Sequence, residues 1–439
     1  MLNLALILIL VSILVLLLIV KPRSVFLLIL SSLILFYKPI SQDTVLLTIG
    51  GAKVYPGDLI AASISAFLIF RIPQKRFLFR PRSVILFSLL FMWGLLAIAR
   101  GIPLYGYSAV GESRWYILPM LYYFFILVTF KDEQQIRRLA EWFLYLTVFM
   151  VPFHYVDFYF LGKKERMLPL LLEDPRFEFR FINATEGLLA AFALISLLLF
   201  YLFGEIKRRT IAFYGVLGIL SLSLIVAQIR SVWLAAITGL VMLGIRIVHR
   251  FIQGRVAQQV LSLISALSIV AILSLFLVNQ ANSNLYAVLL KSASFFQNPR
   301  EDPTGSWRLI GWQQELERSM KNSLLGQGLG GYSEWFDGQQ WQRVAVHNGY
   351  IMFFSKFGII GLFLVFFGLF SWYLEMLKYT RIERERYYKL LSHALQICVL
   401  MHLIFALFYD FTIFFWMLLA IGTVLVRKRA SKEVYKNLL

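Results

Sequence analysis

Long runs of apolar residues, separated by shorter polar segments, make up most of this chain. A helix that crosses the hydrocarbon core of a membrane needs about 20 apolar residues, and about thirteen runs approach that length. The predicted spans are roughly 2–20, 24–37, 54–70, 84–99, 115–130, 138–160, 186–203, 211–229, 232–248, 256–279, 348–374, 388–408 and 411–426. The pattern therefore predicts an all-α fold, a polytopic transmembrane bundle of about 12 to 13 helices.

The overall composition leads to the same class. Hydrophobic residues account for 59% and aromatic residues for 16% of the 439 residues, and the mean hydropathy is +0.74. A soluble domain of this length would have no core large enough to hide so much apolar surface. The single cysteine, Cys398, lies within a predicted span and excludes both a disulfide framework and a cysteine metal site.

The basic residues are concentrated in alternate loops. The formal net charge of +19 would by itself be compatible with nucleic-acid binding, but most of the 43 Lys and Arg residues lie in every second loop between the spans. By the positive-inside rule these loops are cytoplasmic. The N-terminus is then outside and the C-terminus inside, and the polar segment 280–346 is extracytoplasmic, together with the loops 100–114 and 163–185. We therefore expect the lipid bilayer, and no nucleic acid, as a partner.

The spans and the polar segments divide the chain into four predicted parts. These are N-terminal transmembrane helices at 1–160, central transmembrane helices at 161–279 with the outer loop 163–185, an extracytoplasmic loop domain at 280–346, and C-terminal transmembrane helices with a basic cytoplasmic tail at 347–439. Because the rest of the chain is so apolar, aqueous chemistry is expected at the third part and its borders.

The extracytoplasmic loop contains an amphipathic pattern. Ser306 can cap a helix that runs from Trp307 to about Lys321. The apolar face of this helix comprises Leu309, Trp312, Leu316 and Met320. Arg308 lies on the opposite face, where periodicity alone predicts a solvated arginine. Such a helix is expected to lie on the membrane or on the roof of the bundle.

Two features that follow this helix are interpreted as structural. The GQGLGG sequence at 326–331 lacks the Lys-Ser/Thr and the preceding strand of a Walker loop, and we interpret it as a flexible turn. Lys356 lies nine residues after His347, which is about 13 Å along a helix and on its other side. We therefore predict that Lys356 pairs with a group inside the bundle, such as Asp410.

Polar side chains at the borders of spans are the candidates for chemistry. His347 lies where the extracytoplasmic loop enters a span, and histidine is the side chain best suited to take a proton from a hydroxyl near neutral pH. Arg230 lies at a tight turn between two apolar spans, where a charge is costly unless it is paired or hydrated. It is either an interfacial anchor or an anion contact. Arg180, in the loop 163–185, either anchors the start of the following helix or contacts an anion. No His-rich or paired-acid cluster in the sequence indicates a metal site.

Several segments resemble the successive motifs of the O-antigen ligase superfamily. They are AQIRSVWLA, SWRLIGWQQEL, LLGQGLGGY and VHNGYIMFFSKFGIIGLF, and the resemblance covers about residues 175–370. It implies a bundle similar to the C-type (GT-C) glycosyltransferases, which transfers a glycan from a polyprenyl diphosphate donor without a metal or another cofactor. It also implies that His347 is catalytic and that Arg230, Arg308 and Arg180 bind the diphosphate.

The function implied by the resemblance is that of a membrane glycosyltransferase of the O-antigen ligase type. It would move a glycan from an undecaprenyl diphosphate carrier to an acceptor hydroxyl, such as that of lipid A-core, on the periplasmic face of the bacterial inner membrane. A surface polysaccharide polymerase of the same superfamily, with a glycan as acceptor, is the alternative, because no motif identifies the acceptor. A transporter is a third candidate, but it predicts charged residues near the bilayer midplane and internal repeats, whereas the arginines gather at the outer edge.

Overall fold

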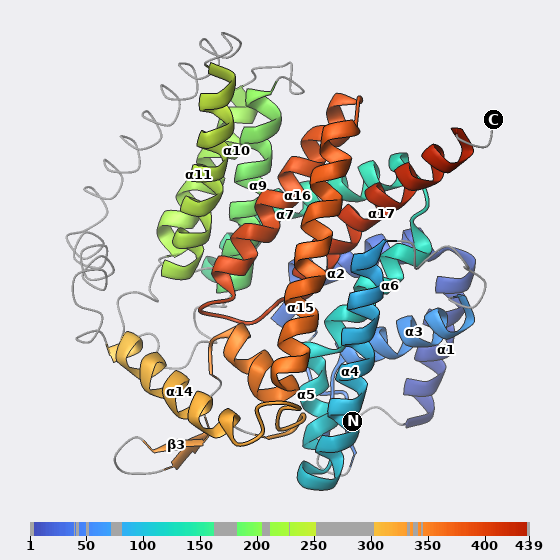
Figure 1. Cartoon of the computed structure of the whole chain (residues 1–439), viewed down its shortest axis with the longest axis vertical. Helices are drawn as coiled ribbons and strands as arrows, with labels where there is room; N and C mark the ends of the chain where they lie inside the picture. The colour runs from blue at the N-terminus through green and yellow to red at the C-terminus, as the bar shows by residue number, and fades with distance from the viewer. Residues whose placement is uncertain are drawn as a thin grey trace. The chain divides into compact units, whose positions relative to one another are not determined.

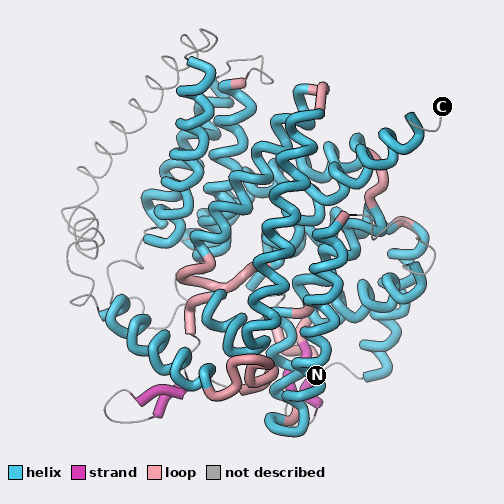
Figure 2. Tube along the Cα trace, in the orientation of Figure 1, coloured by secondary structure: helices cyan, strands magenta, loops and turns pink. Residues whose placement is uncertain are grey.

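Helices make up almost all of the regular structure in the computed structural model of the chain (Figure 1). The structure describes residues 4–38, 40, 44–49, 52–71, 81–161, 182–203, 211–227, 229–251, 303–331, 334–336, 341–343 and 346–436. These residues form fourteen helices and two short antiparallel hairpins, which are magenta in Figure 2. The predicted all-α class is therefore confirmed.

The chain forms two compact units. The first comprises Met1–Phe143, Arg308–Arg384 and Ala406–Leu439, and the second comprises Leu144–Trp307 and Glu385–Phe405. Elements of the first unit are α1 (Leu4–Val20), α2 (Pro22–Lys38), β1 (Leu47–Ile49), β2 (Ala52–Val54), α3 (Pro56–Arg71), α4 (Arg82–Tyr105), α5 (Ser108–Tyr116), α6 (Leu118–Thr129), the start of α7 (Glu133–Tyr159), most of α14 (Pro303–Met320), β3 (Glu334–Phe336), β4 (Trp341–Arg343), α15 (Gly349–Ile382) and α17 (Ile413–Lys436). Elements of the second unit are the rest of α7, α9 (Ala184–Leu202), α10 (Ile211–Ala227), α11 (Arg230–Phe251) and α16 (Arg386–Phe405).

Six helices among the described residues are long and apolar enough to cross a membrane. They are Arg82–Tyr105, Glu133–Tyr159, Ala184–Leu202, Arg230–Val248, Gly349–Ile382 and Arg386–Phe405. Five further apolar helices are shorter, at Ile7–Val20, Pro22–Phe36, Leu118–Thr129, Ala212–Ile225 and Ile413–Arg427. The predicted polytopic membrane bundle is therefore confirmed. The predicted span 256–279 lies outside the described residues.

Close helix packing defines the core of the first unit, where α15 lies against α4 and α17 lies against α6. Glycine allows close approaches at two helix contacts. A Cβ atom added to Gly368 of α15 would lie 2.5 Å from the ring of Phe87, and one added to Gly422 of α17 would lie 2.5 Å from the ring of Trp372. Small residues at such contacts let spanning helices approach closely, which provides much of the packing energy in a membrane.

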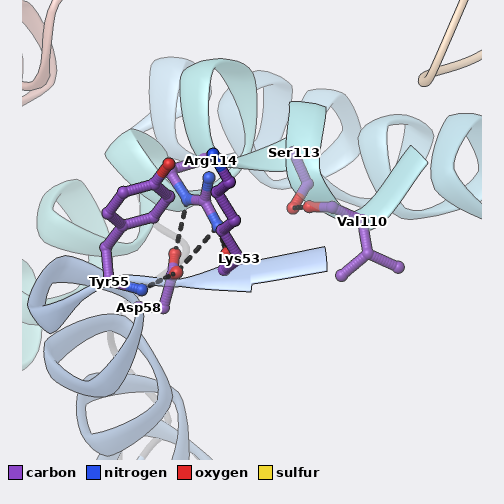
Figure 3. Close-up of polar contacts among 6 residues, drawn as sticks. All are labelled: Lys53, Tyr55, Asp58, Val110, Ser113 and Arg114. Carbon is purple, nitrogen blue, oxygen red and sulfur yellow. Dashed lines mark hydrogen bonds and ion pairs between the residues drawn. The ribbon is translucent and has the colours of Figure 1, made fainter. Parts of the chain in front are cut away.

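Arg114 connects α5 to α3 by an ion pair and to the first hairpin by a hydrogen bond (Figure 3). The guanidinium of Arg114 binds both oxygens of Asp58 at 2.7 Å and donates to the carbonyl oxygen of Lys53 at 2.9 Å. It also lies 4.6 Å from the ring centroid of Tyr55. A bidentate pair of this kind satisfies the arginine within the protein, so Arg114 serves the fold and is no candidate for binding a ligand.

The second unit is organised around α9, which packs against α10, α11 and α16. Its first turn is closed by a capping box, in which the N–H of Glu186 donates to the Asn183 side chain at 3.0 Å and the N–H of Asn183 donates to the Glu186 carboxylate at 2.8 Å. The same carboxylate lies 3.3 Å from Nε2 of the buried His154 on α7. This end of α9 also contacts the start of α11, because a Cβ on Gly187 would lie 3.3 Å from Val232.

Candidate functional site

Backbone hydrogen bonds hold His347 at the start of α15. Asn348 is the N-cap residue of this helix, and its side-chain oxygen accepts two hydrogen bonds of 3.1 Å from N–H groups of the first turn. The N–H of Gly349 donates to the carbonyl oxygens of Ala406 and Tyr409 at 2.8 Å. His347 is therefore fixed between α15 and the loop that precedes α17, while its side chain stays exposed.

The side chains of Arg308 and His347 meet at Tyr409. The guanidinium carbon of Arg308 lies 5.6 Å from the centroid of the tyrosine ring, within the range of a cation–π contact. The imidazole of His347 lies 5.5 Å from the same centroid. Trp312, one turn after Arg308, donates from Nε1 to the His347 carbonyl oxygen at 3.3 Å. The structure therefore brings together two of the predicted site residues that are far apart in the chain.

The electrostatics at this position favour a neutral histidine. Packing removes part of the hydration of His347, and the positive charge of Arg308 disfavours a second cation, so the pKa of His347 is lowered from its usual value of about 6.5. No carboxylate among the described residues forms an ion pair with Arg308. The arrangement offers a proton acceptor beside a cation that could bind an anion. In the described part of the chain, no group of three or more His, Cys, Asp or Glu residues could hold a metal ion.

The helix that carries Arg308 begins earlier than the sequence analysis predicted. It starts at Pro303, so the prediction of an N-cap at Ser306 was wrong, and Ser306 lies inside the helix. Proline suits the first helical turn because its φ is already fixed near the helical value. It also lacks an N–H, and an N–H at this position would have no acceptor within the helix.

The polar side of α14 packs against the protein. Glu315 is buried and accepts a hydrogen bond from the hydroxyl of Ser355 on α15. Arg318 donates from Nε to Gln327 at 3.2 Å. Arg308 is half-buried beside Tyr409, so it is less solvated than periodicity alone predicts. These contacts fix the rotation of α14 about its axis, and with it the position of Arg308.

The GQGLGG segment is a fixed, buried turn, and its interpretation as a flexible turn was wrong. Gly326, Gly328 and Gly330 have φ angles of 77°, 81° and 100°, which residues with a Cβ rarely adopt. The N–H of Gly328 donates to the carbonyl oxygen of Lys356 at 3.2 Å, and a Cβ on Gly326 would lie 2.5 Å from the same oxygen. The glycines are therefore needed because the turn lies directly on the backbone of α15.

Lys356 is a structural partner inside the bundle, as predicted, but its partner is Glu112 and not Asp410. Its side chain is 0% exposed, and Nζ lies 2.8 Å from Glu112 Oε1. Lys356 also donates to the carbonyl oxygen of Gly331, while Glu112 accepts from the N–H of Gly330. The pair therefore clamps the glycine turn between α5 and α15. Burial, with a smaller effect of the Glu112 charge, raises the pKa of Asp410 to about 6, which makes it a weaker anionic partner for a lysine.

Arg230 is the first residue of α11, in the second unit. The N–H of Trp233 donates to the carbonyl oxygen of Ile229 at 3.0 Å, and its Nε1 donates to the carbonyl oxygen of Leu224 at 2.7 Å. These bonds close the short connection between α10 and α11 and hold Arg230 at the end of the span. Its role as an anion contact stays a prediction. Arg180 lies outside the described residues.

Two features of the structure were missed by the sequence analysis. Tyr409 gave no signal, because its contacts with Arg308 and His347 depend only on tertiary packing. The buried pair of His154 and Glu186 in the second unit did leave a signal, since ionisable residues within apolar spans are often functional.

Comparison with known protein families finds a match in the central part of the chain. Residues 215–366 match the family model described as O-antigen ligase, whose members transfer lipid-linked glycans as ligases or polymerases. The matched range contains Arg230, Arg308 and His347. A search of curated proteins finds no significant match to the chain. The resemblance noted from the sequence motifs is therefore confirmed for this range.

Proposed function

We propose that this protein is a membrane glycosyltransferase of the O-antigen ligase type, which transfers a glycan from a polyprenyl diphosphate donor to a hydroxyl of an acceptor such as lipid A-core. The observation that carries the proposal is the meeting of Arg308 and His347 at Tyr409, at the start of a candidate span and within the range that matches the family. Displacement of a diphosphate by a hydroxyl is assisted by a cation for the leaving group and a base for the proton.

The reaction is a direct displacement at the anomeric carbon of the donor sugar. Neutral His347 takes the proton of the acceptor hydroxyl. The acceptor oxygen bonds to the anomeric carbon as the bond from that carbon to the diphosphate oxygen breaks. The diphosphate leaves on the polyprenyl carrier with the electron pair of the broken bond. Arg308 neutralises its developing charge, and we assign the same role to Arg230 and Arg180.

We propose further that the site faces the periplasm and that the chain lies in a bacterial inner membrane. His347 and Arg384 lie at opposite ends of α15, which is one candidate span. Arg384 belongs to a basic loop that the positive-inside rule assigns to the cytoplasm. His347 is then on the other side, where a lipid-linked donor that has crossed the membrane presents its diphosphate.

Reconstitution tests the proposal. The purified protein is inserted into liposomes with an undecaprenyl diphosphate glycan and lipid A-core, and the products are separated. Glycan on lipid A-core is the expected result and identifies a ligase, whereas a longer glycan on the carrier identifies the alternative, a polymerase. Arg230→Ala and Arg308→Ala should abolish either product, and lysine at each position should restore only part of the activity because it loses the bidentate fork.

Two results would contradict the proposal, and a third would contradict the role of the arginines. Folded wild-type protein that forms neither product would exclude glycan transfer under these conditions. Movement of the donor across the bilayer without any product would favour a transporter. Near-normal turnover of both alanine variants would mean that the two arginines are interfacial anchors.

A further inference from the structure

One apolar stripe of α14 is left uncovered. Leu309, Leu316 and Met320 are 47%, 40% and 65% exposed, and their positions in the sequence place them on the same side of the helix. Single exposed apolar residues are common on protein surfaces. A stripe of them along one helix indicates a surface that contacts something apolar.

The contacts of α14 with the protein direct this stripe outward. Glu315 and Ser319, on an adjacent side of the helix, are buried, and Glu315 binds Ser355 of α15. At the edge of the stripe, the ring of Trp312 lies 6.2 Å from that of Phe408. Rotating the helix to bury the stripe would break the buried hydrogen bond of Glu315, which is costly. The exposed stripe is therefore a fixed feature of the fold.

The stripe leads into the apolar surface of a spanning helix. Leu324 and Leu325, which follow α14, are also exposed, and the N–H of Ile359 donates to the carbonyl oxygen of Ser323 at 2.8 Å. The helical geometry of α15 is interrupted at Gly358, and Ile359 begins the long part that follows. Ile359 is exposed, and so are other large apolar residues of this part. In Figure 1, α14 runs obliquely to this part of α15. The exposed apolar surface of a candidate span therefore continues onto a helix that runs in another direction.

We propose that α14 lies along the boundary between membrane and water, with Leu309, Leu316 and Met320 in the hydrocarbon of the lipid leaflet. Helices of this kind bury their apolar face about 5–10 Å into the interface. Lys321, exposed just after α14, is placed to reach anionic headgroups. The membrane contact holds Arg308, on the protein-facing side, at headgroup depth. The contact itself does not depend on the proposed transfer reaction.

Site-specific fluorescence in liposomes tests this contact. Leu316→Cys and Met320→Cys, each with Cys398→Ser, carry an environment-sensitive label. Glu317→Cys is the matched control, because Glu317 is also exposed but lies on another side of α14. Lipids with a nitroxide near the top of the acyl chain should quench the labels at 316 and 320 more strongly than the label at 317. Iodide in the water should quench the label at 317 more strongly than the labels at 316 and 320.

Two outcomes overturn the proposal. If iodide quenches all three labels equally, the stripe faces water. If the label at 316 is protected from both quenchers, another protein surface, such as a second copy of the chain, covers it. Glycan transfer is measured separately in the same liposomes, so failure of the lipid contact is distinguishable from failure of the proposed function.

Discussion

Arg308 and His347 are coupled through a shared neighbour, the ring of Tyr409. The guanidinium carbon of Arg308 lies 5.6 Å from the ring centroid and the His347 imidazole lies 5.5 Å from it. A positive charge at this range makes protonation of the imidazole less favourable. The proton affinity of His347 therefore depends on Arg308, and this dependence can be measured.

Replacing Arg308 with glutamine should shift the pH profile of transfer to higher pH. A general base acts as the neutral imidazole, so wild-type activity should rise with pH through one ionisation below the usual histidine pKa of about 6.5. Arg308→Gln removes the positive charge while the packing persists, so the pKa of His347 should rise. Glutamine still offers an N–H donor to the diphosphate, so Arg308→Gln should keep a slow transfer that Arg308→Ala lacks. The measurement is the pH dependence of this slow transfer in single turnovers.

Lys321→Gln is the matched control for this shift. It removes one positive charge just beyond the other end of α14, where the side chain is exposed and screened by water. Its profile should coincide with that of the wild type. An unchanged midpoint in Arg308→Gln, or an equal shift in Lys321→Gln, would contradict a local coupling between Arg308 and His347.

Replacing His347 with alanine should lower the transfer step by about 10²- to 10⁴-fold. The His347 side chain is exposed, and the segment is held by backbone hydrogen bonds, so the fold should be retained. Donor binding, measured separately, should change little because the arginines remain. Normal transfer by this variant would exclude His347 from the chemistry. Chelator should leave the wild type fully active, and a loss of activity with chelator would mean that a metal takes part.

The spans and the polar border could be predicted because a membrane imposes a strong local constraint. Every backbone polar group of a span must be satisfied within its helix, so an apolar run of sufficient length predicts an element such as α9 to within two residues at each end. His347 and Arg308 could be selected for a similar reason. A titratable or charged side chain at the end of such a run is costly enough to require an explanation.

The contacts between those side chains could not be predicted, because they depend on tertiary packing. Lys356 was expected to meet Asp410, but its partner Glu112 comes from a short helix whose place beside α15 is encoded by no local pattern. The glycines of the GQGLGG turn suggested freedom of movement. In the structure they let the backbone of the turn approach the backbone of α15. This role cannot be inferred without knowing that α15 is the segment against which the turn packs.

Replacing Gly326 with alanine should destabilise the protein, whereas Gly311→Ala should not. The φ of 77° at Gly326 would cost an alanine about 1–2 kcal/mol, and its Cβ would also clash with the Lys356 carbonyl oxygen at 2.5 Å. Gly311 lies inside α14 with open space around an added Cβ, where alanine is favoured by up to about 1 kcal/mol. Thermal unfolding in detergent compares the two. Equal unfolding midpoints for the two variants would mean that the turn accommodates Gly326→Ala without loss of stability.

Cysteine labelling should place the loop before α5 and the loop after α15 on opposite sides of the membrane. Tyr107, between α4 and α5, is 61% exposed, and Arg384, between α15 and α16, is also exposed. In a Cys398→Ser background, an impermeant maleimide should react with Tyr107→Cys in intact cells and with Arg384→Cys only after permeabilisation. The reverse pattern would put His347 in the cytoplasm and contradict the proposed mechanism.

Breaking the buried pair of Lys356 and Glu112 should destabilise the first unit more than removing both charges does. Glu112→Gln leaves the charged lysine buried without its partner, at a cost of about 3–5 kcal/mol. Lys356→Met leaves Glu112, which is 18% exposed and can reach some water, so its cost should be at the lower end of that range. The double variant leaves no uncompensated charge and should be less destabilised than the sum of the two, as measured by a double-mutant cycle on thermal unfolding.

An exposed pair on α7 provides the control for this cycle. Arg137 and Glu141 lie 2.8 Å apart at i,i+4 spacing, with side chains 47% and 35% exposed, and such pairs contribute only about 0.3–0.5 kcal/mol. Glu141→Gln makes the same chemical change as Glu112→Gln but leaves a hydrated arginine, so it should hardly move the unfolding temperature. If Glu112→Gln behaves like Glu141→Gln, then the clamp on the glycine turn does not depend on the charge of Glu112, and the backbone hydrogen bonds of the turn alone hold it against α15.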